Sequence, residues 1–221
     1  MRGMEMKKVL VVAAHPDDEL LGVGGTVARH VQAGDEVYSV IACEGESLRY
    51  QKDVGQAEAI KKAAEILGVR QVFHLKFPDQ RLDTYTLVDI ISPLEDISNE
   101  IKPNIVYCQW GGDVNRDHKI LFEAATVAFR PLDKWIEEFL TFYTVSSTEW
   151  GYPRNFVPDT WVDITETIHK KSEAFRAYQS EIREYPHPRS ERALENAARF
   201  FGNQCTMDAA EVFMTVRRIK R

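Results

Sequence analysis

A chain of 221 residues with 44% hydrophobic side chains can bury one sizeable core, and a second independent domain is not expected. The net charge of −6, from 28 basic and 34 acidic residues without a basic block, argues against a nucleic-acid surface and favours a small-molecule substrate. Three scattered cysteines (Cys43, Cys108, Cys205) indicate neither a disulfide framework nor a thiolate zinc site. The apolar run near the start is too short for a signal peptide or a membrane span, so we expect a cytoplasmic protein.

Short apolar runs alternate with segments of helical periodicity along the whole chain. The pattern predicts strands at residues 8–14, 36–42, 72–75, 104–109, 139–145, 160–164 and 211–217, and helices at 19–33, 56–67, 87–101, 165–180 and 190–201, with a further helix after His118. Strands that alternate with helices pair in parallel through right-handed crossovers. The expected fold class is therefore α/β, with a Rossmann-like, mostly parallel sheet and helices on both faces, in a single domain over residues 1–221.

The first strand ends in the most informative segment of the chain, Ala14-His15-Pro16-Asp17-Asp18-Glu19. Three adjacent carboxylates repel one another unless a cation compensates, and imidazole with carboxylate suits zinc or a similar divalent metal. An isolated Asp-Asp-Glu would more often cap the following helix. Because a histidine immediately precedes Pro16, we interpret this segment as half of a metal site.

A second polar strand exit follows residues 104–109 and contains Gly111-Gly112-Asp113-Val114-Asn115-Arg116-Asp117-His118. The carboxyl ends of parallel strands line one crevice, so two such exits can meet despite about 100 intervening residues. We expect His118 to lie beside His15 and Asp18. A histidine on its own is more often structural, but metal-bound imidazoles are commonly oriented by a carboxylate, and Asp117 is a candidate for that task.

These motifs resemble those of the LmbE-like and PIG-L-like family, zinc-dependent deacetylases that remove N-acetyl groups from glucosamine-type sugars. The resemblance covers nearly the whole chain. Its most specific part is the first box, and weaker support comes from the remaining matches: Gly22 with Gly24-Gly25-Thr26, the Asp117-His118 pair, Trp161-Val162-Asp163-Ile164-Thr165, and Ala210-Glu211-Val212-Phe213.

The resemblance implies that His15, Asp18 and His118 bind Zn²⁺, although Fe²⁺, Co²⁺ or Mn²⁺ also suits two imidazoles and one carboxylate. It further implies that Asp17 is the general base for a metal-activated water that attacks the amide. The expected substrate is an N-acylated amino sugar or its conjugate. A homo-oligomer is compatible with the sequence, which does not set the number of subunits.

The chain departs from the family pattern at two places. Many relatives carry a histidine three residues before the second metal-binding histidine, where this chain has Asn115; an amide donates a hydrogen bond but does not shuttle protons. Either Asp17 performs both proton transfers or another group assists, and His187 is the first candidate. The family also tends to place a substrate-binding arginine before the helix that here begins near Gln56. The basic residues nearest to that position are Arg49 and Lys52, and neither is a clear equivalent.

Further substrate contacts are expected from Arg49, from Arg189 and from an aromatic ring. Trp110 and Trp150 are candidates for stacking on a pyranose face, although aromatic residues near strand ends usually pack in the core. Two other classes remain open: a magnesium-binding phospho-receiver domain, against which His15 and His118 argue, and a non-catalytic metal or sugar-nucleotide binding protein of the same fold, which Asn115 makes less remote.

Overall fold

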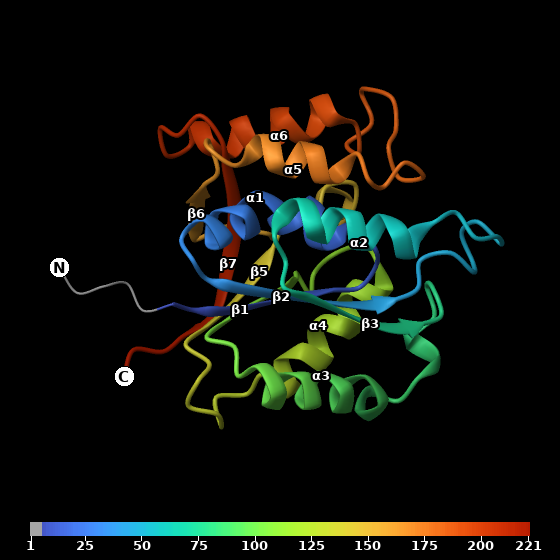
Figure 1. Ribbon diagram of the computed structural model, residues 1–221, viewed down its shortest axis with the longest axis vertical. Helices are drawn as coiled ribbons and strands as arrows, with labels where there is room; N and C mark the ends of the chain where they lie inside the picture. The colour runs from blue at the N-terminus through green and yellow to red at the C-terminus, as the bar shows by residue number, and fades with distance from the viewer. Residues whose placement is uncertain (1–5) are drawn as a thin grey trace.

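The computed structural model describes residues 6–221, and a seven-stranded sheet forms its centre (Figure 1). The sheet order is β3-β2-β1-β4-β5-β7-β6. Strands β1 to β5 run parallel, and β7 is antiparallel to both β5 and β6. The strands are β1 (Lys8–Ala13), β2 (Glu36–Cys43), β3 (Gln71–Phe77), β4 (Ile105–Gln109), β5 (Glu138–Phe142), β6 (Thr160–Asp163) and β7 (Ala210–Arg218).

Helices cover both faces of this sheet. In Figure 1, α1, α2, α5 and α6 lie above it, and α3 and α4 lie below it. The helices are α1 (Asp18–Gln32), α2 (Gln56–Leu67), α3 (Leu87–Ile101), α4 (Arg116–Ala128), α5 (Ile168–Phe175) and α6 (Glu191–Asn203), with short 3₁₀ turns η1 (Leu82–Thr84) and η2 (Thr148–Trp150). The expected α/β fold with a mostly parallel sheet is confirmed.

Strand β1 shows why the central strands read as continuous apolar runs. Val9 and Val11 pack in the core under α1, whereas Leu10 and Val12 pack in the core over α3 and α4. Both faces of a central parallel strand are buried, so the hydrophobic pattern does not alternate. Helix α1 approaches the sheet closely at Gly22, where an added Cβ would lie 2.0 Å from the ring of Phe142. Close helix packing, as expected for these glycines, sets the position of α1 and of the segment that precedes it.

Two predicted elements end well before their expected last residue. The helix expected to run to residue 180 ends at Phe175, because the chain continues in turns such as Tyr178 N–H to Phe175 C=O and Glu181 N–H to Tyr178 C=O. The strand expected to run to residue 145 ends at Phe142, because the Thr144 N–H bonds to the Thr148 side chain instead of to a neighbouring strand. Both deviations place polar residues at the carboxyl edge of the sheet.

Within residues 6–221, none of the helices has the combination of length and apolar character that crossing a bilayer requires.

Candidate metal centre and active site

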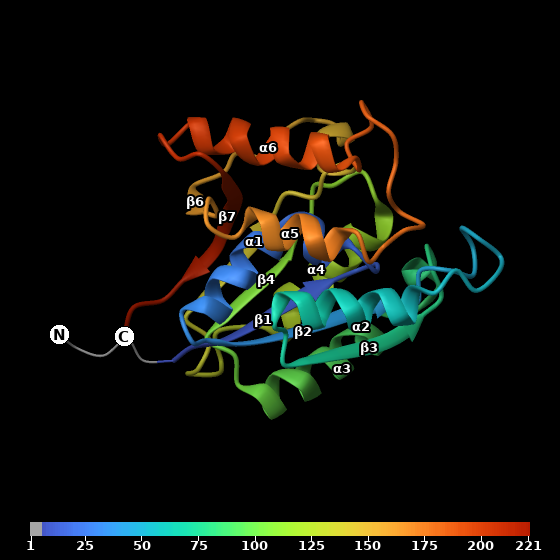
Figure 2. The ribbon, with the colours of Figure 1, turned by 45° about the horizontal axis from the view of Figure 1, so that its top comes forward.

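The candidate site lies at the carboxyl ends of β1 and β4, which are neighbours in the sheet (Figure 2). The chain leaves β1 for a helix on one face and leaves β4 for a helix on the other. Loops that diverge in this way open a crevice at the switch point of a doubly wound sheet. The two polar strand exits therefore lie side by side.

Three side chains, His15, Asp18 and His118, converge in this crevice. Nδ1 of His15 lies 3.2 Å from Oδ2 of Asp18 and 3.3 Å from Nε2 of His118, and that Nε2 lies 3.1 Å from the same Asp18 oxygen. None of the three residues is more than 2% exposed. Ligands about 2.0–2.2 Å from a zinc ion at tetrahedral angles lie about 3.3–3.6 Å apart. The observed spacing fits one divalent ion after a small adjustment.

The electrostatics of the same residues favour a positive charge between them. Burial lowers the pKa of His118, but the carboxylates of Asp18 and Asp113 outweigh burial and raise it to about 10. Burial would raise the pKa of Asp18, yet the two imidazoles hold it well below its ordinary value. Oδ1 of Asp18 is buried without a hydrogen-bond partner among the described residues. A cation bound by Asp18 Oδ2 and the two facing imidazole nitrogens would also compensate the charge on this unpartnered oxygen.

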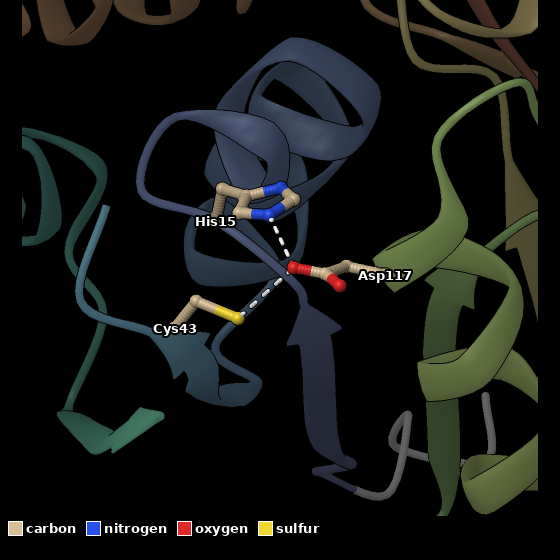
Figure 3. A group of neighbouring side chains, drawn as sticks. All are labelled: His15, Cys43 and Asp117. Atoms are coloured by element: carbon tan, nitrogen blue, oxygen red, sulfur yellow. Dashed lines mark hydrogen bonds and ion pairs between the residues drawn. The ribbon is translucent and has the colours of Figure 1, made fainter. Parts of the chain in front are cut away.

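Asp117 holds Nε2 of His15, the ring nitrogen that does not face His118 (Figure 3). Nε2 of His15 lies 3.0 Å from Oδ2 of Asp117, and the Cys43 thiol donates to that oxygen at 3.5 Å. The backbone N–H of Leu82 donates to the other carboxylate oxygen at 3.2 Å. An Nε2–H that donates to Asp117 leaves the Nδ1 lone pair free for a metal. Asp117 therefore contacts the distant His15, not its sequence neighbour His118.

A second group of side chains also has ligand-type atoms within 4.8 Å of one another: His15, Cys43 and Asp117. It uses the opposite nitrogen of the same imidazole ring. Its atoms already hydrogen-bond to one another, and burial with the nearby Asp117 carboxylate raises the pKa of the thiol, which keeps it protonated. We interpret this group as the support for His15.

The loop after β3 adds two residues that the sequence analysis missed. Oδ1 of Asp79 lies 3.5 Å from Nε2 of His15, and the amide of Gln80 lies 3.0 Å from the same nitrogen. Asp79 is fully buried, and its carboxylate faces Arg49 at 3.7 Å. Their only sequence signal is their position at a third strand exit.

His118 has its own carboxylate partner, Asp113, which the sequence analysis also left without a role. Oδ2 of Asp113 lies 3.3 Å from Nδ1 of His118. Thr148 donates to Asp113 at 2.9 Å, and the Ser147 hydroxyl donates to its other oxygen. In the sequence, Asp113 could have been identified as a candidate by its position in the second polar strand exit. Its hydroxyl partners come from a loop more than 30 residues away.

Asp17 lies beside the three converging residues in a strained backbone conformation. It is the N-cap of α1 with φ of 93°, a left-handed geometry that is uncommon for non-glycine residues. The residue is fully buried, and neither carboxylate oxygen accepts a hydrogen bond from the described residues. Its backbone N–H donates to Glu19, which places Glu19 as a support for this turn. Burial raises the pKa of Asp17 well above its ordinary value, although the Arg189 guanidinium opposes this shift.

Arg189 and Arg49 meet at Glu181, a buried carboxylate that the sequence analysis did not single out. Nη1 of Arg189 lies 3.1 Å from Asp17 Oδ2 and 2.6 Å from Glu181 Oε2, and Nη1 of Arg49 lies 3.4 Å from that Glu181 oxygen. Tyr50 and Gln56 donate to the other oxygen at 2.8 and 2.9 Å. Glu181 thus holds both arginines at one edge of the crevice.

A pocket of about 490 Å³ opens above these groups, which is within the usual range for small-molecule sites. It brings together most of the residues that the sequence analysis singled out. Its lining includes His15, Arg49, Asn115, His118, Trp150, Glu181, Arg183, His187 and Arg189.

Of the remaining residues predicted from the sequence, Asn115 and His187 line this pocket and Trp110 does not. Asn115 lies at the pocket, where its side-chain oxygen caps α4 by accepting from the Asp117 N–H at 2.9 Å. His187 lines the pocket, and its Nδ1 accepts from the Arg189 N–H at 3.0 Å. Trp110 is 8% exposed, packs edge-on against Phe156 and does not line the pocket. The Trp110 ring is packed against neighbouring side chains and does not face this pocket.

Comparison with known proteins agrees with this geometry. The family model described as PIG-L, GlcNAc-PI de-N-acetylase, matches residues 10–129, which is more than half of the chain. The chain therefore belongs to the PIG-L family of deacetylases, as the sequence motifs indicated, and this assignment replaces the receiver-domain alternative.

Individual relatives extend the match over the rest of the chain. "Uncharacterized deacetylase YaiS" of Escherichia coli is 33% identical over 165 residues, 72% of this chain and 83% of the relative. "Diacetylchitobiose deacetylase" of Thermococcus kodakarensis is 26% identical and covers 90% of this chain and 79% of its own. The crystal structure of a conserved protein from Thermus thermophilus, TT1542, superposes with a TM-score of 0.79 at 25% identity, covering 98% and 97% of the two chains.

Proposed function

We propose that this deacetylase hydrolyses the acyl amide of an N-acylated amino sugar or its conjugate, with one divalent metal ion at its centre. The observation that carries this proposal is the convergence of His15, Asp18 and His118 beside the buried carboxylate of Asp17. The substrate class is supported by the family's description and by a relative named for diacetylchitobiose.

The proposed ligands are Nδ1 of His15, Nε2 of His118 and the carboxylate of Asp18. The proposal is supported by the mutual distances of the two imidazole nitrogens and Asp18 Oδ2, and by Asp18 Oδ1, which is buried without a hydrogen bond from the described residues. The pocket lined by both histidines gives substrate access to one side of the group. Zinc is the metal that this donor set favours, while Fe²⁺, Co²⁺ and Mn²⁺ also accept it. A bound divalent ion supplies a Lewis acid for the amide carbonyl and lowers the pKa of a water molecule.

Asp17 is the proposed general base. Its two oxygens are free of hydrogen bonds from the described residues, and Arg189 holds the carboxylate in place from one side. It takes a proton from the attacking water and carries that proton to the nitrogen of the leaving amine. The amide C–N bond then breaks to give a carboxylic acid and the free amine.

We assign both proton transfers to Asp17, because neither alternative group is well suited to the second. Asn115 has no titratable proton, and its oxygen is used in capping α4. Burial, with Arg183 and Arg189 nearby, lowers the pKa of His187, so this imidazole is mainly neutral at pH 7. A neutral His187 and the guanidinium groups of Arg49 and Arg189 are available for hydrogen bonds to sugar hydroxyls.

The direct test is acetate release. The zinc-loaded protein is expected to release acetate from N-acetylglucosamine or N,N′-diacetylchitobiose and to stop when a chelator removes the metal. Tight binding of both sugars without any acetate would instead support the non-catalytic binding protein. No metal bound and no acetate released would contradict the proposal entirely.

Replacing Asn115 with histidine is expected to restore a titratable group in the pocket. The variant should fold, with a loss of about 1 kcal/mol from the weakened helix cap. Its pH–rate profile should gain an ionisation near the usual histidine range, about pH 6–7, that the parent protein lacks. Superimposable profiles for the two proteins would show that position 115 takes no part in proton transfer.

The Cys43 thiol is expected to contribute to metal affinity through Asp117 and His15. Cys43→Ala should weaken zinc binding by about fivefold to tenfold, because Asp117 loses a donor that fixes its position, whereas Cys43→Ser should retain most of the affinity. Cys108→Ala is a matched control, since Cys108 lies on β4, is fully buried and belongs to the same core cluster as Cys43. Equal zinc dissociation constants for the two alanine variants would refute this role.

A further inference from the structure

Gln109, the last residue of β4, connects the two polar strand exits. It is fully buried, and both ends of its side-chain amide have a partner. The amide oxygen accepts a hydrogen bond from the backbone N–H of Ala14 at 3.1 Å, and the amide nitrogen donates to Oδ2 of Asp18 at 2.8 Å. Gln109 lies outside every motif that the sequence analysis singled out.

The two partners determine which way the Gln109 amide points. Ala14 offers a donor, its backbone N–H, whereas Asp18 offers an acceptor, its carboxylate. Exchanging the amide oxygen and nitrogen would set two donors against each other at Ala14 and two acceptors against each other at Asp18. Buried polar groups in this arrangement would lose both hydrogen bonds, so the amide nitrogen faces Asp18.

A second donor meets the same oxygen of Asp18. The backbone N–H of His15 donates to Oδ2 at 3.0 Å. This oxygen also faces both imidazoles, 3.2 Å from Nδ1 of His15 and 3.1 Å from Nε2 of His118, whereas Oδ1 has no hydrogen-bond partner among the described residues. Two fixed donors therefore hold the carboxylate so that one of its oxygens faces the imidazoles.

Gln109 also holds the backbone that leads to His15. Ala14 immediately precedes His15, and its N–H is bound by Gln109. The Ala14 carbonyl oxygen accepts a hydrogen bond from the backbone N–H of Cys43 at 2.8 Å, so both polar groups of this peptide unit are fixed. One side chain thus acts on two of the proposed metal ligands, on Asp18 directly and on His15 through the backbone.

We propose that Gln109 is a positioning residue that makes Asp18 a one-oxygen ligand and thereby favours zinc over metals of higher coordination number. This inference rests on the metal centre of the proposed function. Two imidazole nitrogens and one carboxylate oxygen suit the four-coordinate geometry of zinc and leave one position open. Mn²⁺ prefers more donors, mainly oxygens, and a carboxylate that is free to turn can offer it both of its oxygens.

The test measures the dissociation constants of Zn²⁺ and Mn²⁺ by competition with a chelator, in the parent protein and in Gln109→Met. Methionine keeps the length of the side chain but forms neither hydrogen bond. Zinc binding should weaken by about 10–100-fold, the range for loss of a group that orients a metal ligand. Binding of Mn²⁺ should weaken less, so the preference for zinc should fall by about tenfold. An unchanged preference overturns the proposal.

Two further variants separate the contact with Asp18 from a general structural effect. Gln109→Glu removes the donor to Asp18 but keeps an acceptor for the Ala14 N–H, and its preference for zinc should fall as in Gln109→Met. The parent preference in Gln109→Glu would overturn the proposal. Gln56→Met is the matched control, because the buried Gln56 amide donates to another buried carboxylate, that of Glu181, at 2.9 Å. An equal loss of preference in Gln56→Met would also overturn it.

The metal preference is measured without substrate, which separates this inference from the proposed function. A preference that depends on Gln109, with no acetate released from either sugar, would refute the deacetylase proposal and keep the positioning role. Acetate release with the same metal preference in all four proteins would refute the positioning role alone.

Discussion

Replacing His15, Asp18 or His118 with alanine is expected to remove the bound metal ion. Each substitution deletes one of the three donors that lie 3.1–3.3 Å from one another, and the two that remain are too few for a stable protein site. Metal content should fall from about one ion per chain to nearly none, and acetate release should fall by about a thousandfold or more. Elemental analysis of the purified variants and an acetate assay measure both effects.

His30→Ala is the control for this series. His30 lies near the far end of the helix that begins at Asp18, and its ring contacts Asp35 and Tyr107 instead of the crevice. It should keep the full metal content. If His118→Ala retained a stoichiometric ion, the assignment of the second polar exit to the metal would be wrong.

Replacing Asp17 with asparagine is expected to separate catalysis from metal binding. Asparagine fits the left-handed backbone at this position and keeps the size of the side chain, but it cannot accept a proton. The variant should hold about one metal ion per chain and lose activity by about 10²–10⁴-fold, the range for loss of a general base.

Asp18→Asn is the matched comparison, since it makes the same change one residue further along and should lose metal as well as activity. Metal analysis and turnover are measured on both proteins at equal loading. Turnover of Asp17→Asn at the parent rate would refute the assignment of Asp17 as the base.

The parts of this site that could be predicted from sequence are those encoded by neighbouring residues. His15, Asp17 and Asp18 form one contiguous box after a buried strand, and the parallel sheet that brings His118 beside them follows from alternating strands and helices. The antiparallel direction of β7 could not be predicted, because period-two hydrophobicity carries no information on strand direction.

The supporting residues could not be predicted, because their roles depend on partners far away in the chain. Asp113 accepts hydrogen bonds from two hydroxyls that lie 34 and 35 residues further along the chain. Glu181 accepts a hydrogen bond from Tyr50, which lies 131 residues earlier. Asp117 was expected to support an imidazole, but its contact with His15 instead of His118 depends on the direction in which the first turn of α4 points it. Trp110 and Trp150 are equivalent in sequence terms, and only their burial separates them.

Anomalous diffraction at the zinc edge from crystals of the zinc-loaded protein tests the central claim most directly. We expect one peak about 2.0–2.2 Å from Nδ1 of His15, Nε2 of His118 and the carboxylate of Asp18. A peak bound instead to Nε2 of His15 and the Cys43 sulfur, with His118 left out, would contradict the proposed centre.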